Sequence, residues 1–375
     1  MGVVYVAEFS QGRQVYRAVA GDESTFGVRQ GEGHDLSSSY CSLMVQGEIP
    51  NVIPDSASDA RVQGLGATSA LGIGAYVGVP LYLPDGQLYG SFCGLSHTAQ
   101  EDLNARDGKF MAMLAEFVAE ELGAERQLDV EREAIQGLIE RQDFQIALQP
   151  VVDLLTGRVL SMEALSRFPL PLGSPDLVFA QAERCGLALE LETAAVAKAV
   201  KLLPALAPSQ ALAVNLSPAN ALQLVAQTEA DRPLDQLILE ITEHDAVENY
   251  THIREQLRPL RERGLRLAID DAGAGFASLR HIIELQPDII KIDRSLIANI
   301  DNDAARRSAL STFVLLALDI GGIVVAEGVE TKQELVTIAT QGVDAAQGYL
   351  LARPSTDGAD IARWASGLSL LEDVL

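Results

Sequence analysis

The sequence predicts an α/β fold in which a (β/α)8 barrel follows a smaller α+β domain. The chain has 375 residues, which is more than one hydrophobic core usually serves. From Phe144 onward, short β-rich runs alternate with amphipathic helical stretches, and such alternation is typical of parallel strands joined by helices. The preceding residues show short strands separated by turns, so they form a domain of another kind.

Residues 1 to 100 contain two predicted β-hairpins. The runs GVVYVAEF and RQVYRAVAG meet at a turn at Gln11-Gly12, and a second pair meets at Pro84-Asp85-Gly86. The second pair, GVPLYLPDGQLYGSFCGLS, resembles the closing strands of the GAF family. The resemblance implies a GAF-like sensory domain at residues 1–122, which would receive an unknown small molecule or other signal.

A helical pattern runs from Ala105 to Gln142, as one helix or as two with a hinge near Gly123. We expect residues 123–140 to be a connector and residues 141–375 to be the barrel. The apolar positions of this helix favour pairing with a second copy in a homodimer, and packing on its own domain is the alternative.

Composition limits the classes of function. The formal net charge is −24, which disfavours binding to nucleic acid or to an anionic membrane. No apolar run approaches the roughly 20 residues that span a bilayer, and the N-terminus does not look like a signal peptide, so we expect a cytoplasmic protein. Three cysteines, Cys41, Cys93 and Cys185, are too few for a disulfide framework or a zinc site, and we expect each to be a small buried residue.

Each predicted barrel strand ends on a polar residue, and in a parallel barrel these residues meet at the C-terminal rim. The residues are Glu163, Asn215, Glu240, Asp270 with Asp271, Lys291, Glu327 and Gln347. The first strand pair, joined at Leu155–Arg158, looks antiparallel and departs from the regular barrel.

Five carboxylates in one barrel mouth require compensation. At a separation of about 4 Å, two ionised carboxylates repel by roughly 4 kcal/mol even at an effective dielectric constant near 20. Either some acids are protonated or cations lie among them. Oxygen ligands without His or Cys select Mg²⁺ or Mn²⁺, with Ca²⁺ less suited to catalysis. A pair of such ions is typical of phosphate-ester cleavage.

Taken singly, each residue has a commoner explanation. A strand-end Glu is usually solvated, Lys291 would form a simple ion pair, and the segment Asn215–Ser217 would cap a helix. The recurrence of ligand-type residues at successive strand ends favours a shared site.

The motifs SMEALSRF, VNLS, LEITE, IDDAGAGFASL, IIKIDRS, VAEGVET and AQGYL occur in this order. Together they resemble the EAL-domain family of cyclic di-GMP phosphodiesterases over residues 135 to 370. The resemblance implies a TIM-like barrel with an antiparallel first strand that hydrolyses cyclic di-GMP to linear pGpG by a two-metal mechanism, under control of the N-terminal domain. A catalytically silent cyclic di-GMP receptor is the alternative, and hydrolysis of another phosphodiester such as pGpG is a third.

The resemblance also implies roles for individual residues. One Mg²⁺ or Mn²⁺ would be held by Glu163, Asn215, Glu240 and Asp270, and a second by Asp270, Asp271 and Glu327, with Ca²⁺ inhibitory. The catalytic residues would be Glu327 as general base or water-holding ligand, Lys291 as the residue that orients water, and Glu163. Substrate contacts would come from Gln149, Arg167, Asp271 and Gln347. Supporting residues that position the ligands without touching the ions would be Glu243, Asp293 and Glu330. The family usually has Phe where this chain has Ala272.

Overall fold

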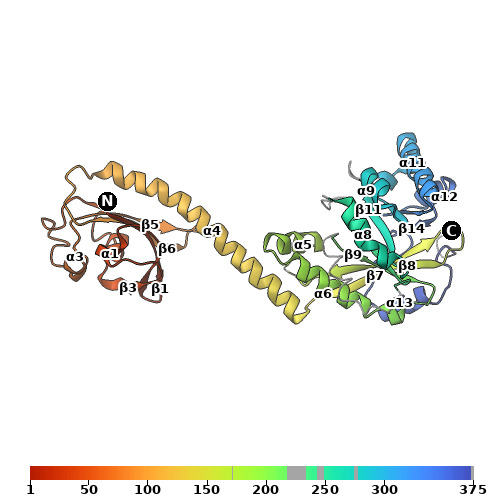
Figure 1. The fold of residues 1–375 in the computed structure, drawn as a ribbon, viewed down its shortest axis with the longest axis horizontal. Coiled ribbons are helices and arrows are strands. Elements are labelled where there is room, and N and C mark those ends of the chain that lie inside the picture. Colours follow the sequence, from red (N-terminus) through yellow and green to blue (C-terminus); the bar gives the residue numbers. More distant parts are fainter. Residues whose placement is uncertain (171, 218–233, 243–248, 274–277, 373–375) are drawn as a thin grey trace. The chain divides into compact units, whose positions relative to one another are not determined.

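The structure, a computed structural model, describes residues 1–170, 172–217, 234–242, 249–273 and 278–372 (Figure 1). The chain divides into two compact units, Met1–Val130 and Glu131–Leu375. The division falls inside the continuous helix α4 (Ala105–Arg141), so the segment predicted as a connector is helical throughout. In the described part of the chain, no helix combines the length and apolarity needed to cross a membrane.

The N-terminal unit is built on a six-stranded antiparallel sheet in the order β3-β2-β1-β6-β5-β4. Its strands are β1 (Val3–Ser10), β2 (Arg13–Gly21), β3 (Gly33–Asp35), β4 (Val52–Ile53), β5 (Ala75–Tyr82) and β6 (Leu88–Ser96). Its short helices are α1 (Glu23–Phe26), α2 (Tyr40–Val45), α3 (Gly66–Ala70) and a 3₁₀ turn at Leu36–Ser38.

Both predicted hairpins are present. Strands β1 and β2 pair antiparallel from Val3↔Gly21 to Ser10↔Arg13, and the turn residues Gln11 and Gly12 have φ of 50° and 76°. Positive φ at both central residues is the geometry that continues the right-handed twist of the two strands. Strands β5 and β6 form the second hairpin.

The sheet of the N-terminal unit is covered on both faces, because successive side chains of a strand point to opposite sides. In β5, Val77 and Val79 pack with Met111 and Ala115 of α4. Tyr76, which precedes Val77, belongs to the larger cluster on the other face, to which α1 and α2 also contribute. The unit therefore has a core of its own.

The C-terminal unit is a closed barrel in the order β10-β11-β12-β13-β14-β7-β8-β9 (Figure 1). Its strands are β7 (Gln145–Asp153), β8 (Val159–Arg167), β9 (Ala211–Asn215), β10 (Leu237–Thr242), β11 (Arg266–Ala272), β12 (Ile289–Ile292), β13 (Ile323–Ala326) and β14 (Ala345–Ala346). The first strand, β7, runs antiparallel to both of its neighbours, and the other described pairings are parallel. The predicted barrel with an antiparallel first strand is confirmed.

Helices surround the barrel strands. They are α5 (Pro175–Arg184), α6 (Ala188–Val200), α8 (Tyr250–Arg261), α9 (Ser278–Leu285), α10 (Arg294–Ile297), α11 (Ala304–Ile320), α12 (Lys332–Thr340) and α13 (Gly358–Ala365), with 3₁₀ turns at Leu203–Ala205 and Ile300–Asn302. Their apolar faces and the outward side chains of the strands form the main core. A second, smaller cluster contains inward side chains such as Ala213, Ile238, Ala268 and Val325.

The segment after the last barrel strand closes the structure against the first. Leu148 N donates to Ser355 O at 2.8 Å, and Ser355 N donates to Leu148 O at 2.9 Å. Gln210 Nε2 donates to the carbonyl oxygen of Trp364 in α13 at 2.8 Å. Residues beyond the eight strands therefore complete hydrogen bonds of the barrel.

Candidate functional site

The predicted site residues share one side of the barrel wall because of strand periodicity. On six strands, an inward apolar residue of the smaller barrel cluster is followed two positions later by a polar residue. Positions i and i+2 of a strand point to the same face. The pairs are Ala213 and Asn215, Ile238 and Glu240, Ala268 and Asp270, Ile289 and Lys291, Val325 and Glu327, and Ala345 and Gln347. The polar residues therefore continue the inner face of the barrel toward the carboxyl ends of the strands.

Strand β8 differs from the prediction, which placed Glu163 at a strand end. Glu163 lies in the middle of β8, because the antiparallel pairing with β7 extends as far as Gln145↔Arg167. In the same register Glu163 lies opposite Gln149. The longer hairpin thus brings a predicted substrate contact beside a predicted metal ligand.

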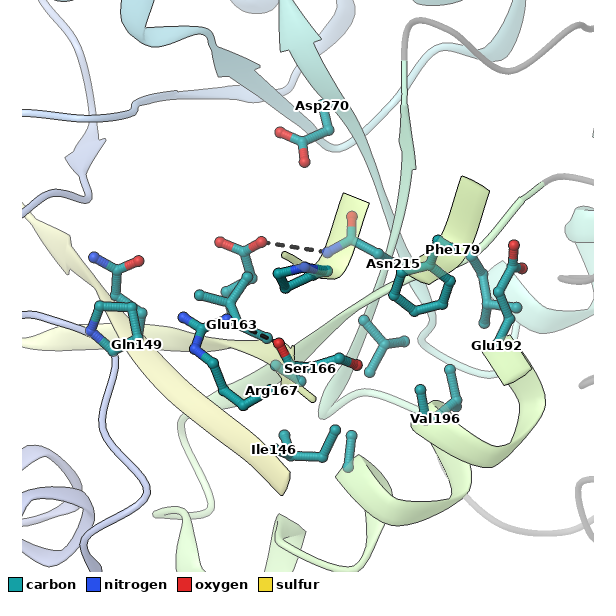
Figure 2. A pocket seen from close by; sticks show the side chains of 18 of the residues that line it. Ile146, Gln149, Glu163, Ser166, Arg167, Phe179, Glu192, Val196, Asn215 and Asp270 are labelled. Atoms are coloured by element: carbon teal, nitrogen blue, oxygen red, sulfur yellow. Dashed lines mark hydrogen bonds between the residues drawn. The ribbon is translucent and has the colours of Figure 1, made fainter. Parts of the chain in front are cut away.

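Two groups of acids lie close enough to share cations. Oxygen atoms of Glu163, Glu240 and Asp270 lie within 4.8 Å of one another, and the same limit holds for Asp270, Asp271 and Glu327. Asn215 Nδ2 donates to Glu163 Oε1 at 3.3 Å. Figure 2 shows the side chains of Glu163, Asn215 and Asp270 directed into one shared space. Asp270 belongs to both groups and would bridge them.

Adjacent acids reach this space together because β11 is irregular. Neighbouring residues of a regular strand point to opposite faces. The pairing of β11 with β12 shifts register between Ile269 and Ala272, and Asp271 has a positive φ of 54°. A bulge of this kind re-aims a side chain at the cost of backbone strain. Ala272, which follows, is fully buried in the main core.

Lys291 lies at the centre of the acids. Its Nζ is 2.8 Å from Glu327 Oε1, 3.0 Å from Glu240 Oε1, 3.0 Å from Asp270 Oδ1 and 3.6 Å from Glu163 Oε2. The side chain is only 2% exposed. Burial alone would lower the pKa of Lys291, but the four carboxylates hold it well above its ordinary value, so the residue is a cation.

One ammonium does not balance these acids. Burial raises the pKa of Glu240 and of Glu327 well above the ordinary value, and neighbouring acids add to the rise although Lys291 opposes it. With all five carboxylates ionised, the group would carry a formal charge of −4, which two divalent cations would neutralise. Without cations, Glu240 and Glu327 are the acids whose raised pKa values favour the protonated form.

The donor set fits hard divalent cations. Every acidic ligand offers oxygen, the chemistry that Mg²⁺ and Mn²⁺ prefer. Two buried oxygen atoms of this site, Glu240 Oε2 and Gln347 Oε1, are among the described side-chain atoms that have no hydrogen-bond partner. Buried polar atoms are normally satisfied, so these two indicate a ligand that the polypeptide itself does not supply.

Gln347 links the acids to the first strand. Its Nε2 donates to Gln149 Oε1 at 2.9 Å and to Glu163 Oε2 at 2.6 Å, and Gln149 Nε2 donates to Ala352 O at 3.0 Å. The next residue, Gly348, is required by close packing, since a Cβ there would lie 2.1 Å from the Val329 carbonyl oxygen. Gln347, a predicted substrate contact, therefore holds the predicted metal ligand Glu163, and Gln149 in turn contacts Gln347.

A cavity of about 570 Å³ opens beside the acids (Figure 2). Arg167, the last residue of β8, lies on its wall with Phe179 and Tyr349, and Asp270 and Asp271 line its acidic end. Its volume is typical of small-molecule sites. The guanidinium donor fork of arginine suits a phosphate group.

The two described residues that were predicted to support the metal ligands, Asp293 and Glu330, have different contacts. Asp293 accepts a hydrogen bond from Ser295 N at 2.8 Å and caps α10. Glu330 forms an exposed ion pair with Arg294 and lines a recess next to the acids. Glu243 lies outside the described residues.

Sequence reasoning missed Glu192 of α6. Its Oε2 accepts hydrogen bonds from Ser217 N at 3.0 Å and Ser217 Oγ at 3.1 Å, so it anchors the chain directly after β9. A Glu within an amphipathic helix carries no local signal of such a role. Ser217 is also the residue that the sequence offered as a helix cap, and residues 218–233, where such a helix would lie, are outside the described residues.

Comparison with known proteins supplies independent findings. A family model described as EAL domain matches residues 132–354. The cyclic di-GMP phosphodiesterase RocR of Pseudomonas aeruginosa is 30% identical over 271 residues, which cover 66% of this chain and 67% of RocR. NbdA, a cyclic di-GMP phosphodiesterase of the same species, is 32% identical over 256 residues, or 64% of this chain and 33% of NbdA.

A solved structure agrees in fold. The PaMucR phosphodiesterase in complex with c-di-GMP superimposes with a TM-score of 0.53 at 27% identity, covering 61% of this chain and 97% of that chain. The chain spans between 27% and 49% of the length of three further curated relatives. The family match lies within the barrel unit, Glu131–Leu375.

Proposed function

The chain belongs to the EAL domain family, and from this membership we propose that it is a metal-dependent phosphodiesterase that hydrolyses cyclic di-GMP to linear pGpG. The observation that carries the proposal is the pair of acid groups that share Asp270 around the buried Lys291. RocR and NbdA, which are named cyclic di-GMP phosphodiesterases, support the choice of substrate.

The residues present would hold two Mg²⁺ or Mn²⁺ ions. Glu163, Asn215, Glu240 and Asp270 would bind one ion, and Asp270, Asp271 and Glu327 the other. When bound, such a pair lowers the pKa of water and stabilises the charge that develops on the phosphate ester. Ca²⁺ is larger and takes a looser shell of six to eight ligands, so we expect it to inhibit.

Protein groups would complete the reaction. Glu327 would accept a proton from the attacking water as general base, or would hold that water in place. Lys291 would orient that water and offset negative charge as the 3′ oxygen departs. Arg167 would bind phosphate through its donor fork, while Gln149 and Gln347 would position the dinucleotide and Glu163.

We further propose that the N-terminal unit is a GAF-like sensory domain that regulates cleavage. Its antiparallel sheet has a closed core of its own, which is suited to an independent sensing module. Helix α4 supports the proposed homodimer, because Phe110, Met113 and Phe117 recur on one face of it and are 57%, 48% and 65% exposed. Apolar residues at this spacing are typical of paired helices.

A silent cyclic di-GMP receptor is the second candidate. It would use the same cavity and Arg167 without turnover. The complete set of acidic ligands favours the enzyme, since a receptor needs no pair of cation sites.

The experiment is incubation of the full chain with cyclic di-GMP and Mn²⁺ or Mg²⁺, with nucleotides separated by ion-exchange chromatography. We expect pGpG to accumulate with either ion and to vanish with EDTA or in Glu163→Gln. Glu255→Gln, a change of the same kind at an exposed position of α8, serves as the matched control and should retain cleavage. Tight binding of cyclic di-GMP without product in both metals would establish the receptor instead.

A further inference from the structure

Two cysteines distant in sequence meet in the core of the N-terminal unit. Cys41 Sγ lies 3.2 Å from Cys93 Sγ, although 52 positions separate the residues. Cys41 belongs to α2 and Cys93 to β6, and both belong to the apolar cluster that covers this face of the sheet. They are 1% and 0% exposed.

We propose that Cys41 and Cys93 form a reversible dithiol–disulfide pair, oxidised by a small hydroperoxide and restored by a thiol reductant. The pair is a modification site in the N-terminal unit, separate from the phosphodiesterase site. Where disulfides occur in reducing compartments, they are usually transient and redox-sensing, and a reversible pair fits that class.

The surroundings favour thiolate formation at Cys41 and not at Cys93. Tyr5 Oη lies 3.4 Å from Cys41 Sγ, and Tyr76 Oη lies 3.5 Å from Cys93 Sγ. Burial raises the pKa of both phenols well above the ordinary value, so each stays protonated and can donate to sulfur. Burial opposes ionisation of Cys41, yet hydrogen bonds from Cys93 and its other neighbours lower its pKa to about 7, whereas burial raises that of Cys93. One thiol is therefore the better nucleophile.

The geometry permits bond formation with small movements. A disulfide bond is about 2.05 Å long, so the sulfurs need to approach by about 1.2 Å. Gly78 of β5 lets Tyr76 and Cys93 pack closely against the strand, because a Cβ there would lie 2.8 Å from Cys93 Sγ and 2.1 Å from Tyr76 Oη. Helix α2 has six residues, and movement of so short an element is enough to bring the sulfurs together.

The chemical steps balance. The Cys41 thiolate attacks one oxygen of hydrogen peroxide, the O–O bond breaks, and a sulfenic acid and hydroxide form. The Cys93 sulfur, losing its proton to that hydroxide, then attacks the Cys41 sulfur and displaces its hydroxyl group, which leaves as water after protonation. Overall, two thiols lose two electrons and two protons, and one peroxide becomes two waters. A thiol reductant returns both thiols by exchange through a mixed disulfide.

The test treats the folded full chain with hydrogen peroxide, then unfolds it in an alkylating reagent and maps its peptides by mass spectrometry. We expect a peptide containing Cys41 joined to one containing Cys93, loss of two hydrogens per chain, and alkylation of Cys185 alone. Dithiothreitol before alkylation should restore three alkylated cysteines. The readout does not depend on nucleotide cleavage, so its failure and failure of the proposed function are distinguishable.

Matched variants sharpen the result. Cys185→Ser should keep the link, and Cys41→Ser should abolish it and leave Cys93 available to the reagent. Circular dichroism checks that each variant is folded, and if neither Cys41→Ser nor Cys93→Ser folds, the peptide map of the unaltered chain decides. A link that involves Cys185, or three free thiols at a peroxide dose that oxidises the unfolded chain, would overturn the proposal.

Discussion

Lys291 Nζ lies 2.8 Å from Glu327 Oε1 in a site where the lysine side chain is 2% exposed. The same ammonium contacts three further acids, so it is the principal positive charge within the cluster. Removing one partner of a buried ion pair costs about 3–5 kcal/mol, because the other partner is left uncompensated.

Lys291→Met should therefore lower the thermal stability of the metal-free protein and abolish cleavage. Added Mn²⁺ should recover part of the lost stability, since the cation replaces the missing positive charge. Thermal melts in EDTA and in Mn²⁺ measure both effects. Lys332→Met, at an exposed position of α12, is the control and should melt like the unaltered chain. An unchanged melt of Lys291→Met in EDTA would contradict the role of Lys291 as counter-charge.

Substitutions of Asp271 separate the effect of its charge on cleavage from the effect of its backbone conformation on stability. Its φ of 54° lies in the left-handed region, which Asn tolerates and β-branched residues avoid. Asp271→Asn should retain the melting temperature and lose most of the cleavage activity. Asp271→Val should lose activity and also about 1–2 kcal/mol of stability. Denaturant unfolding compares the two variants, and equal stability would show that the bulge is absent in solution.

Gln347 tests whether the hydrogen bonds behind the acids matter. Gln347→Leu keeps a side chain of similar volume but removes the donor to Glu163 Oε2 and Gln149 Oε1. Loss of a residue that orients a metal ligand typically costs about 10–100-fold in metal affinity or activity, and we expect a loss in that range. Steady-state cleavage at several Mn²⁺ concentrations measures it. Gln333→Leu, at an exposed position of α12, should change neither the metal affinity nor the cleavage activity.

The raised pKa values of Glu240 and Glu327 predict proton release on metal binding. These carboxyls keep protons at pH values where exposed carboxyls have lost them, and cations require the ionised form. Mn²⁺ affinity should therefore rise with pH until the cluster is deprotonated. Titration calorimetry in buffers of different ionisation enthalpy measures the protons released. The same apparent enthalpy in every buffer would show that the acids are already ionised before the metal binds.

Much of the site was predictable from the sequence, because alternate residues of a strand point to the same face and this pattern needs only a few neighbouring residues. Glu240 lies two positions after the inward Ile238, and Lys291 lies two positions after the inward Ile289. The sequence of each strand therefore indicates which of its side chains point inward. Residue type then predicted the chemistry. The bulge at Asp271 was not predictable, because a left-handed aspartate within a strand depends on its pairing with β12.

Contacts between segments distant in the chain were also not predictable from the sequence. Cys41 and Cys93 carry no pattern that joins them, and their meeting depends on how α2 lies against β6. The edge strands β3 and β4 have three and two residues, too few for any periodicity, whereas the hairpin β5–β6 was visible through its turn. Prediction succeeded where the signal lay within a few neighbouring residues.

The reciprocal hydrogen bonds between Leu148 and Ser355 have a practical meaning for anyone who expresses the catalytic half separately. The family match stops at residue 354, one position before this contact. A truncation at that boundary would remove Ser355, the hydrogen-bond partner of Leu148 in the first barrel strand. It would also remove the Trp364 carbonyl oxygen, which accepts from Gln210. An excised barrel that keeps α13 would retain both sets of contacts.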